Sequence, residues 1–159
     1  MSLPRVLFVC SGNTCRSPMA AALAASLEPA LKASSAGVSA VPDQSASEGA
    51  LESMRARGLD LGAHRSRRLD SRLVEEADLI LVMTRAHRRA IEKLFPSAMK
   101  RLALLTEYAR RGAEALGSPD GEDVPDPFGR PQSVYDACAE ELELALRAAR
   151  AHWSEMPVG

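Results

Sequence analysis

Residues 10–18 read Cys-Ser-Gly-Asn-Thr-Cys-Arg-Ser-Pro and follow directly on the apolar residues 6–9, Val-Leu-Phe-Val. A short, continuous apolar run is typical of a strand that is buried on both faces. Ser17-Pro18 is typical of a helix start, with Ser17 as the N-cap and Pro18 at the first helical position. The stretch therefore predicts a strand, a tight loop and a helix in immediate succession.

The loop has the composition of an anion-binding site. Cys10 and Arg16 are separated by five small or turn-forming residues, among which Gly12 and Asn13 tolerate the positive φ of a tight loop. Backbone N–H groups of such a loop can point inward at one tetrahedral anion, and the adjoining helix N-terminus favours negative charge. Arg16 would add a planar pair of donors for two phosphate oxygens.

The Cys10 thiol would lie below the bound phosphorus, placed for in-line attack. A cysteine at a helix N-terminus beside a cation is favoured in its reactive thiolate form, and the Ser17 hydroxyl could donate a hydrogen bond to the sulfur. The order of these features predicts a phosphoryl-transfer site. The alternative is a small, buried and inert Cys10. A nucleoside-triphosphate cradle is excluded because its glycine spacing and its lysine are absent.

Segments typical of strands and of helices alternate along the chain, which predicts an α/β fold with a parallel sheet and right-handed crossovers. Ligands of such sheets bind at the carboxyl ends of the strands, and Cys10 ends the first one. The expected strands are residues 5–9, 33–38, 79–83 and 102–105. The expected helices are residues 17–28, 44–57 (with Gly58 as its C-terminal cap), 86–95 and 132–153, the last with Val134, Cys138, Leu142, Ala145 and Ala149 on one face.

Length and composition predict one soluble domain, residues 1–159. Apolar residues make up 46% of the chain and charged residues 26%, and the net charge of −1 indicates no partnership with nucleic acid or membrane. There is no signal peptide or membrane-spanning run, and three cysteines favour a reducing cytoplasm over a disulfide-linked secreted domain. Metal-ligand spacings are absent, so we expect no metal and no cofactor.

Residues 106–130 are rich in glycine and proline and are expected to form a long irregular loop. Its carboxylates are by default solvated charges. Asp126 differs because Pro125 and Pro127 restrict its backbone, so a stiff loop could hold its carboxyl group over the anion site. From the residues alone, Asp126 is favoured only weakly over its acidic neighbours, Asp120, Glu122 and Asp123.

These motifs together resemble the low-molecular-weight protein tyrosine phosphatase family, and most closely its bacterial protein arginine phosphatase branch. The resemblance covers nearly the whole chain, through residues 10–20, 35–37, 64–67, 78–83 and 126–129. It implies a three-layer fold in which a four-stranded parallel sheet of order 2-1-3-4 has helices on both faces. It also implies a cysteinyl-phosphate mechanism on phosphorylated proteins.

The resemblance assigns roles to particular residues. Cys10, Arg16 and Asp126 would be catalytic, with Asp126 as the general acid. His64 would lie behind the loop, hydrogen-bonded near Asn13, and would support it together with Asn13 and Ser17. Cys10 and Cys15 would form a reversible disulfide under oxidation, although a small Cys15 facing the core is the alternative. Substrate and phosphate would be bound by Ser11, Gly12, Asn13, Thr14, Cys15, Ser17 and Phe128.

Thr14 favours phosphoarginine as the substrate. Tyrosine-specific members of the resembling family carry a larger aliphatic residue here, whereas a threonine hydroxyl can bond the attacking water or a guanidino group. Thr14 as a mere β-branched filler is the alternative. Phe128-Gly129 agrees with arginine, because tyrosine-specific members place two aromatic residues after Asp-Pro. We therefore predict a protein arginine phosphatase. We also expect the protein to act as a monomer.

Other functions remain possible at this point. A low-molecular-weight tyrosine phosphatase is the main one. An arsenate reductase would need relay thiols, yet no cysteine lies between Cys15 and Cys138. A non-catalytic anion-binding or redox module would have no use for Asp126. Away from the loop, we expect Cys138 to be inert core, and His87 and His152 to lie on the surface. The arginines of 64–72 and 85–89 are expected to be solvated charges, the alternative being that they steer phosphorylated partners to the site.

Overall fold

Four parallel strands form one sheet in the order β2-β1-β3-β4 in the computed structural model, which describes residues 3–156. The strands are β1 (Arg5–Cys10), β2 (Lys32–Gly37), β3 (Leu79–Val82) and β4 (Leu102–Leu104). Within the sheet, Val9 of β1 is paired with Ala36 of β2 and with Val82 of β3. The predicted α/β fold and strand order are confirmed. Because all strands are parallel, their carboxyl ends meet at one edge, and Cys10 lies at that edge.

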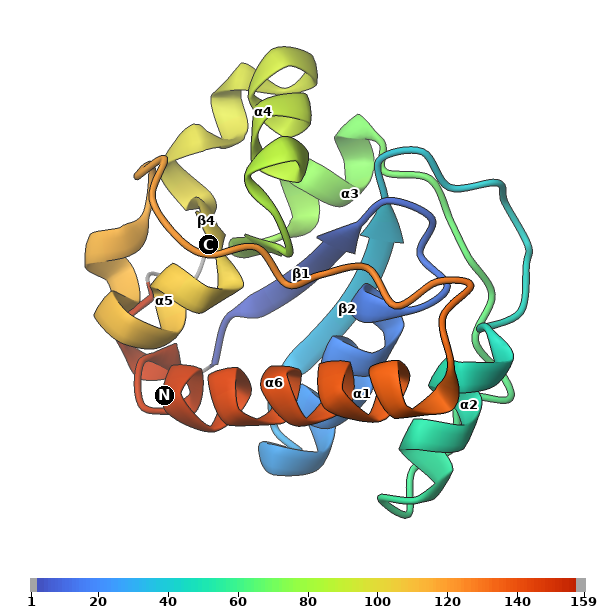
Figure 1. Ribbon diagram of the computed structural model, residues 1–159. Helices are drawn as coiled ribbons and strands as arrows, with labels where there is room; N and C mark the ends of the chain where they lie inside the picture. The colour runs from blue at the N-terminus through green and yellow to red at the C-terminus, as the bar shows by residue number, and fades with distance from the viewer. Residues whose placement is uncertain (1–2, 157–159) are drawn as a thin grey trace.

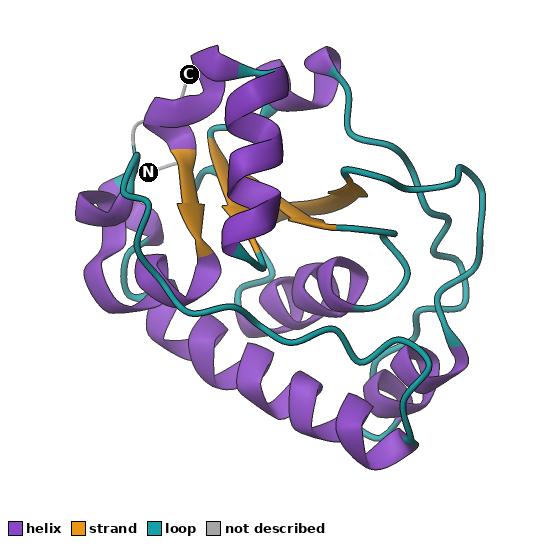
Figure 2. Ribbon diagram, turned by 45° about the horizontal axis from the view of Figure 1, so that its top comes forward, coloured by secondary structure: helices purple, strands orange, loops and turns teal. Residues whose placement is uncertain are grey.

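Alternate side chains of each strand point to opposite faces of the sheet, and helices cover both faces (Figure 2). Val6 and Phe8 of β1 belong to a core formed with α1, α2, α5 and α6, whereas Leu7 and Val9 belong to a core formed with α3, α4 and η1. The helices are α1 (Arg16–Leu27), α2 (Glu48–Arg55), α3 (Ser71–Glu76), α4 (Arg85–Leu94), α5 (Leu105–Arg111) and α6 (Gln132–Arg150), with 3₁₀ turns η1 (Pro96–Arg101), η2 (Gly112–Ala115) and η3 (Trp153–Glu155).

The long helix α6 packs against α1, α2 and α5 along one side of the molecule (Figure 1). Cys138, Leu142 and Ala149 are buried in this contact as predicted, but Val134 and Ala145 are only partly buried. Figure 1 also shows residues 116–131 crossing the front of the molecule between α5 and the start of α6. Among residues 3–156, no helix combines the length and the apolar character that crossing a lipid bilayer requires.

Two helices lie where none was predicted. The first, α5, occupies the start of the expected 106–130 loop, and its Leu105 and Tyr108 are completely buried. The glycines and prolines that led to the loop prediction begin only at Gly112, which ends α5 with a positive φ of 59°. The second, α3, begins after Asp70, whose carboxylate accepts a hydrogen bond from the Leu73 N–H at 2.8 Å. That N-cap is a signal in the sequence that could have identified α3.

Most helix boundaries differ from the prediction by one to four residues. Helix α2 begins at Glu48 rather than at residue 44. The residues before it do not form a helix because they run beside the Cys10–Arg16 loop, where Ser47 N donates to the Thr14 carbonyl at 3.0 Å. The end of this helix also differs, because α2 ends at Arg55 with Ala56 as the C-cap, two residues before the predicted end. Gly58 does have a positive φ of 75°, and the N–H groups of residues 58 and 59 bond back to Arg55 and Met54. Helix α6 ends at Arg150, three residues early. Helix α1 begins one residue early, as described below.

Candidate active site

The Cys10–Arg16 loop joins the end of β1 directly to the start of α1. The helix begins at Arg16, with Cys15 as the N-cap, and its first backbone bond runs from Met19 N to the Cys15 carbonyl at 3.2 Å. The prediction that Ser17 is the N-cap and Pro18 the first helical residue is therefore wrong by two residues, since Pro18 is the third residue of the helix. Since the Ser17 hydroxyl has no capping bond to make, it is available to the loop.

Asn13 holds the loop together from inside. It is completely buried, and it takes the positive φ of 56° that the sequence predicts, whereas Gly12 does not have a positive φ. Its side-chain amide donates to Ser17 Oγ at 2.8 Å and to Ser35 Oγ at 3.0 Å, and its side-chain oxygen accepts from the Arg67 N–H at 3.0 Å. Four segments of the chain thus meet at one amide.

His64 lies behind the loop. Its Nε2 is 2.7 Å from the Asn13 carbonyl oxygen, so the hydrogen bond expected from the family resemblance is present. A neutral or charged imidazole can donate this bond from Nε2. The contact fixes the direction of one loop carbonyl, and it does so from outside the anion side of the loop.

The nucleophile proposed from sequence, Cys10, is buried at the carboxyl end of β1, and its Sγ is 2.9 Å from Ser17 Oγ. Ser17 already accepts a hydrogen bond from the Asn13 amide, so its own proton is left to donate. The acceptors within reach are Cys10 Sγ and, at a longer 3.4 Å, the Ala36 carbonyl. The geometry therefore directs the Ser17 hydroxyl proton to the sulfur, where it stabilises a thiolate.

Strand β2 approaches the loop too closely for any side chain at Gly37. A Cβ at this position would collide with the Ser11 carbonyl oxygen and lie 2.9 Å from the Asn13 nitrogen. The residues that follow bond to the loop instead: Val38 N donates to the Cys10 carbonyl at 3.0 Å and Ser39 N donates to the Ser11 carbonyl at 2.9 Å. The sheet edge thus fixes the carbonyl groups of the first half of the loop.

Arg16 connects the loop with the 116–131 segment. Its side chain is buried, Nη1 donates to the Val124 carbonyl at 2.9 Å, and Nη2 lies 3.7 Å from Asp126 Oδ2. Its Nε is buried without a hydrogen-bond partner among residues 3–156. An unpaired buried donor of this kind is rare in proteins, and an oxyanion bound in the loop would satisfy it.

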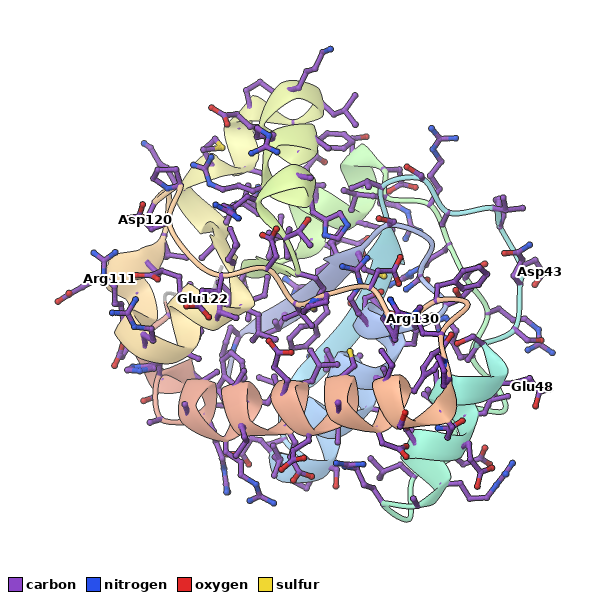
Figure 3. All side chains as sticks on the ribbon, viewed as in Figure 1. Asp43, Glu48, Arg111, Asp120, Glu122 and Arg130 are labelled. Atoms are coloured by element: carbon purple, nitrogen blue, oxygen red, sulfur yellow. The ribbon has the colours of Figure 1, made fainter. Side chains whose placement is uncertain are left out.

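Asp126 is half exposed at 52%, and its Oδ1 accepts a hydrogen bond from the Phe128 N–H at 3.1 Å. The other three acidic residues of the segment are elsewhere. Asp120 and Glu122 lie beside α5, at the opposite end of the segment from Arg130 (Figure 3). Of the four carboxylates considered in the sequence, Asp126 alone lines the cavity described next.

A cavity of about 270 Å³ opens above the loop. Seven of the predicted residues line it, whereas Ser11, Asn13, Ser17 and His64 support the loop from other sides. Three further lining residues, Ser39, Val41 and Gln44, come from the extended stretch after β2 and were not predicted from the sequence. Val41 and Phe128 are exposed at the mouth, at 60% and 65%. The predicted residues that line the cavity are Cys10, Gly12, Thr14, Cys15, Arg16, Asp126 and Phe128.

Cys15 has polar neighbours outside the loop. Its Sγ is 3.1 Å from Ser47 Oγ and 3.5 Å from Tyr135 Oη. Tyr135 reaches this position because it packs on Gly49, where any side chain would collide with its ring. Cys10, Cys15 and Cys138 are all free thiols in this structure, and burial raises the pKa of Cys138 to about 12, so that this third thiol is inert at neutral pH.

Two residues that were expected on the surface, His87 and Arg88, are buried. His87, expected on the surface, is only 4% exposed, and its Nε2 is 2.8 Å from Ser11 Oγ. Asp123 is exposed, as expected, but it also accepts a hydrogen bond at 2.8 Å from the N–H of Arg85, the first residue of α4. Arg88, another expected surface residue, is buried and donates to the Gly117 carbonyl. Sequence patterns did not reveal these residues because their partners lie on distant segments.

Comparison with known proteins identifies the family. The family described as "Low molecular weight phosphotyrosine protein phosphatase" matches residues 5–155. The chain belongs to this family. It is 40% identical over 143 residues to the protein-arginine-phosphatase of Geobacillus stearothermophilus, covering 89% of this chain and 90% of that one. It is 34% identical over 155 residues to the low molecular weight protein-tyrosine-phosphatase Ptp of Acinetobacter johnsonii, covering 98% and 99% of the two chains.

A solved structure agrees with the family assignment. The cysteine-to-serine mutant of the YwlE arginine phosphatase, whose active-site serine is phosphorylated, superposes with a TM-score of 0.82 at 36% identity, covering 92% of this chain and 93% of the other. The protein is thus a low-molecular-weight protein phosphatase with an active-site cysteine nucleophile, and phosphoproteins are its substrates. Neither an arsenate reductase nor a non-catalytic module is supported.

Proposed function

We propose that this phosphatase removes the phosphoryl group from phosphoarginine in proteins, with Cys10 as the nucleophile, Arg16 as the oxyanion ligand and Asp126 as the general acid and base. The observation that carries the proposal is the cavity in which these three side chains converge with Thr14. Phosphoryl transfer depends mainly on positioning and on fixed positive charge around the equatorial oxygens.

In the first step, the Cys10 thiolate attacks phosphorus, so that an S–P bond forms while the bond from phosphorus to the guanidino nitrogen breaks. Asp126 donates its proton to the departing nitrogen. The buried Nε of Arg16, which lacks a protein partner among residues 3–156, would bind one equatorial oxygen. Because the loop N–H groups and Arg16 supply the positive charge, no metal enters the mechanism.

In the second step, water attacks the phosphorus of the cysteinyl phosphate and Asp126 accepts the water's proton. The S–P bond breaks and inorganic phosphate is released. Ser17 supports the departing sulfur, since its hydroxyl proton is directed at Cys10 Sγ over 2.9 Å. The same hydrogen bond serves both steps, because sulfur carries negative charge at the start of the first and at the end of the second.

Two features of the cavity favour arginine over tyrosine. Thr14 lines the cavity, and within residues 3–156 its hydroxyl has only one long contact, 3.7 Å to Cys15 Sγ, so it is available to a polar substrate group or to water. Gly129 follows Phe128 with a φ of 76°, and a Cβ there would meet nothing within 4 Å. The cavity therefore has one aromatic wall rather than two, which suits a flexible guanidino side chain.

Tyrosine phosphatase activity is the second candidate, favoured by the tyrosine phosphatase relative that covers almost the whole chain. Phenol, like guanidine, needs a proton to depart, so Asp126 would serve both. The two substrates differ in what lines the cavity around the leaving group.

Kinetics on matched peptides carrying phosphoarginine or phosphotyrosine would separate the candidates. We expect kcat/KM to be higher for phosphoarginine, and we expect Thr14→Ile to shift the ratio toward phosphotyrosine by about tenfold or more. Thr14→Val and Thr14→Ser are the matched controls, because the first removes the hydroxyl at constant volume and the second keeps it. A ratio that none of the three variants changes would remove the argument for arginine.

The Cys10–Cys15 disulfide belongs to the same proposal as a reversible protection of the nucleophile. Cys15 lines the same cavity as Cys10 and both are free thiols here. Peroxide inactivation that a dithiol reverses in the parent protein, and that becomes irreversible in Cys15→Ser, is the expected result. Equal recovery of both proteins would count against a protective disulfide.

A further inference from the structure

His87 is a buried imidazole that the mechanism above does not use. It lies in the first turn of α4, where its N–H donates to Thr84 Oγ1 at 3.1 Å, and only 4% of it is exposed. Its Nε2 is 2.8 Å from the Oγ of Ser11, the second residue of the Cys10–Arg16 loop. Its Nδ1 is buried and has no hydrogen-bond partner among residues 3–156.

The charge on this ring follows from its surroundings. Burial and the nearby Arg16 guanidinium lower the pKa of His87 to about 4, while Asp123 and Asp126 act in the opposite direction. The imidazole is therefore neutral at physiological pH and carries a single proton. Arg16 belongs to α1, whereas Asp123 and Asp126 belong to the 116–131 segment. Both elements lie close enough to the His87 ring for their charges to act on it.

The position of that proton follows from the hydrogen bonds. A proton on Nδ1 would be a buried donor without an acceptor, and such donors are costly. A proton on Nε2 can be donated to Ser11 Oγ. The Nε2–H form is consequently favoured, and Ser11 accepts the bond.

This bond fixes the first half of the loop from a second direction. The Ser11 carbonyl already accepts from Ser39 N at 2.9 Å, on the side of β2. With its side chain held by α4 as well, Ser11 cannot rotate freely, and the residues that follow it, Gly12 and Thr14, line the cavity. The direction of their N–H groups depends on the conformation of the peptide units at residues 11–13.

We propose that His87 is a positioning residue of the active site: from α4 it donates Nε2–H to Ser11 Oγ and so holds the Cys10–Arg16 loop in the shape that binds the phosphoryl group. The inference rests on the phosphatase reaction proposed above. His87 does not touch the reacting atoms in either step of the proposed reaction.

The test is the affinity for inorganic phosphate, measured by titration calorimetry, which needs no turnover. We expect His87→Phe, which keeps the ring volume but cannot donate, to weaken phosphate binding about three- to tenfold. Ser11→Ala should weaken it by the same factor, and the double variant by no more than either alone. His87→Gln, whose amide can replace Nε2–H, should stay within about twofold of the parent protein.

His152→Phe is the matched control, because His152 is paired with Glu155 beside η3 and should leave phosphate affinity unchanged. Unchanged affinity in His87→Phe, or effects of the two single variants that multiply in the double variant, would overturn the proposal. If the protein turned out to prefer phosphotyrosine, the arginine assignment would fail while this comparison would stand, because phosphate affinity does not depend on the leaving group.

Nitrogen-15 NMR of the parent protein gives a second readout that requires no folded variant. We expect a neutral His87 ring at pH 7 with its proton on Nε2. A proton on Nδ1, or a charged ring at that pH, would contradict the proposal even if His87→Phe failed to fold.

Discussion

The Cys10–Arg16 loop and the 116–131 segment face each other across one cavity, but the protein holds them in different ways. The loop is contiguous with a strand and a helix, and its central residue, Asn13, is completely buried and hydrogen-bonded through its side chain to Ser17, Ser35 and Arg67. The other segment carries a half-exposed Asp126. The difference suggests that the loop is a fixed anion site, whereas the 116–131 segment is the side that can vary in geometry and in substrate preference.

Next to Asp126, the 116–131 segment is held at Val124 and Asp123. Val124 is fully buried, its N–H donates to the Met83 carbonyl at 2.8 Å, and its carbonyl accepts from Arg16 Nη1. Asp123 bonds the N–H of Arg85 at the start of α4. Helix α4 therefore contacts both the 116–131 segment, through Asp123, and the Cys10–Arg16 loop, through His87.

The largest effect on turnover is expected from Cys10→Ser, which removes the proposed nucleophile from the Cys10–Arg16 loop. Turnover should fall by about 10⁴-fold or more because the hydroxyl is a far weaker nucleophile in this role. Phosphate affinity should survive, since the loop N–H groups and Arg16 remain. Cys138→Ala, at a buried thiol outside the cavity, is the control. Full turnover in Cys10→Ser, measured on any phosphorylated substrate, would rule out the mechanism.

Asp126→Asn tests the other side of the cavity. We expect kcat to fall about 10²- to 10⁴-fold on phosphoarginine, which needs a proton to depart, and to fall much less on an aryl phosphate with an acidic leaving group. Asp120→Asn is the matched control in the same segment, because Asp120 lies beside α5. Equal losses for both leaving groups would show that Asp126 is not the acid.

The two contacts of α4, His87 with Ser11 and Arg85 with Asp123, should affect the free energy of unfolding in different pH ranges. The pKa of His87 is lowered from 6.5 to about 4, so between these values the unfolded chain binds a proton that the folded one does not. Stability should therefore fall as the pH is lowered from about 6.5 to about 4, by up to about 3 kcal/mol. Chemical denaturation at several pH values measures this, and His87→Gln should flatten the curve in that window. An unchanged curve would contradict the neutral, buried state of His87.

Asp123 should act in a lower pH window and with a smaller effect. Its pKa is lowered from 3.8 chiefly by the hydrogen bond from the Arg85 N–H, so its contribution is present above that value and is lost as the pH falls through the folded-state pKa. We expect Asp123→Ala to lower kcat about two- to fivefold without changing phosphate affinity, since it loosens only the 116–131 segment. Asp120→Ala should change neither. A loss of phosphate affinity in Asp123→Ala would mean that the two sides are not independent.

The loop was predictable because its residues carry short-range constraints. A strand end, a positive-φ asparagine and a helix start follow one another within a few residues, and the apolar runs of β1 and β3 are typical of strands buried on both faces. Helix α5 was not predicted because it is short. Its apolar pattern consists of little more than Leu105 and Tyr108, and the turn residues that begin at Gly112 follow it directly. The cavity wall at Ser39, Val41 and Gln44 was missed because nothing local distinguishes an extended stretch at a site from any other loop.

By itself the sequence determined the alternation of strands and helices, apart from α3 and α5, and the tight loop between Cys10 and Arg16, because these depend on local conformation and on neighbours along the chain. Tertiary structure alone decided that His87 is buried against Ser11, that Asp123 holds the start of α4, and that Asp126 rather than Asp120 lies in the cavity. Each of these depends on partners dozens of residues away. Their charge and hydrogen bonding are fixed by burial, which a sequence pattern does not report.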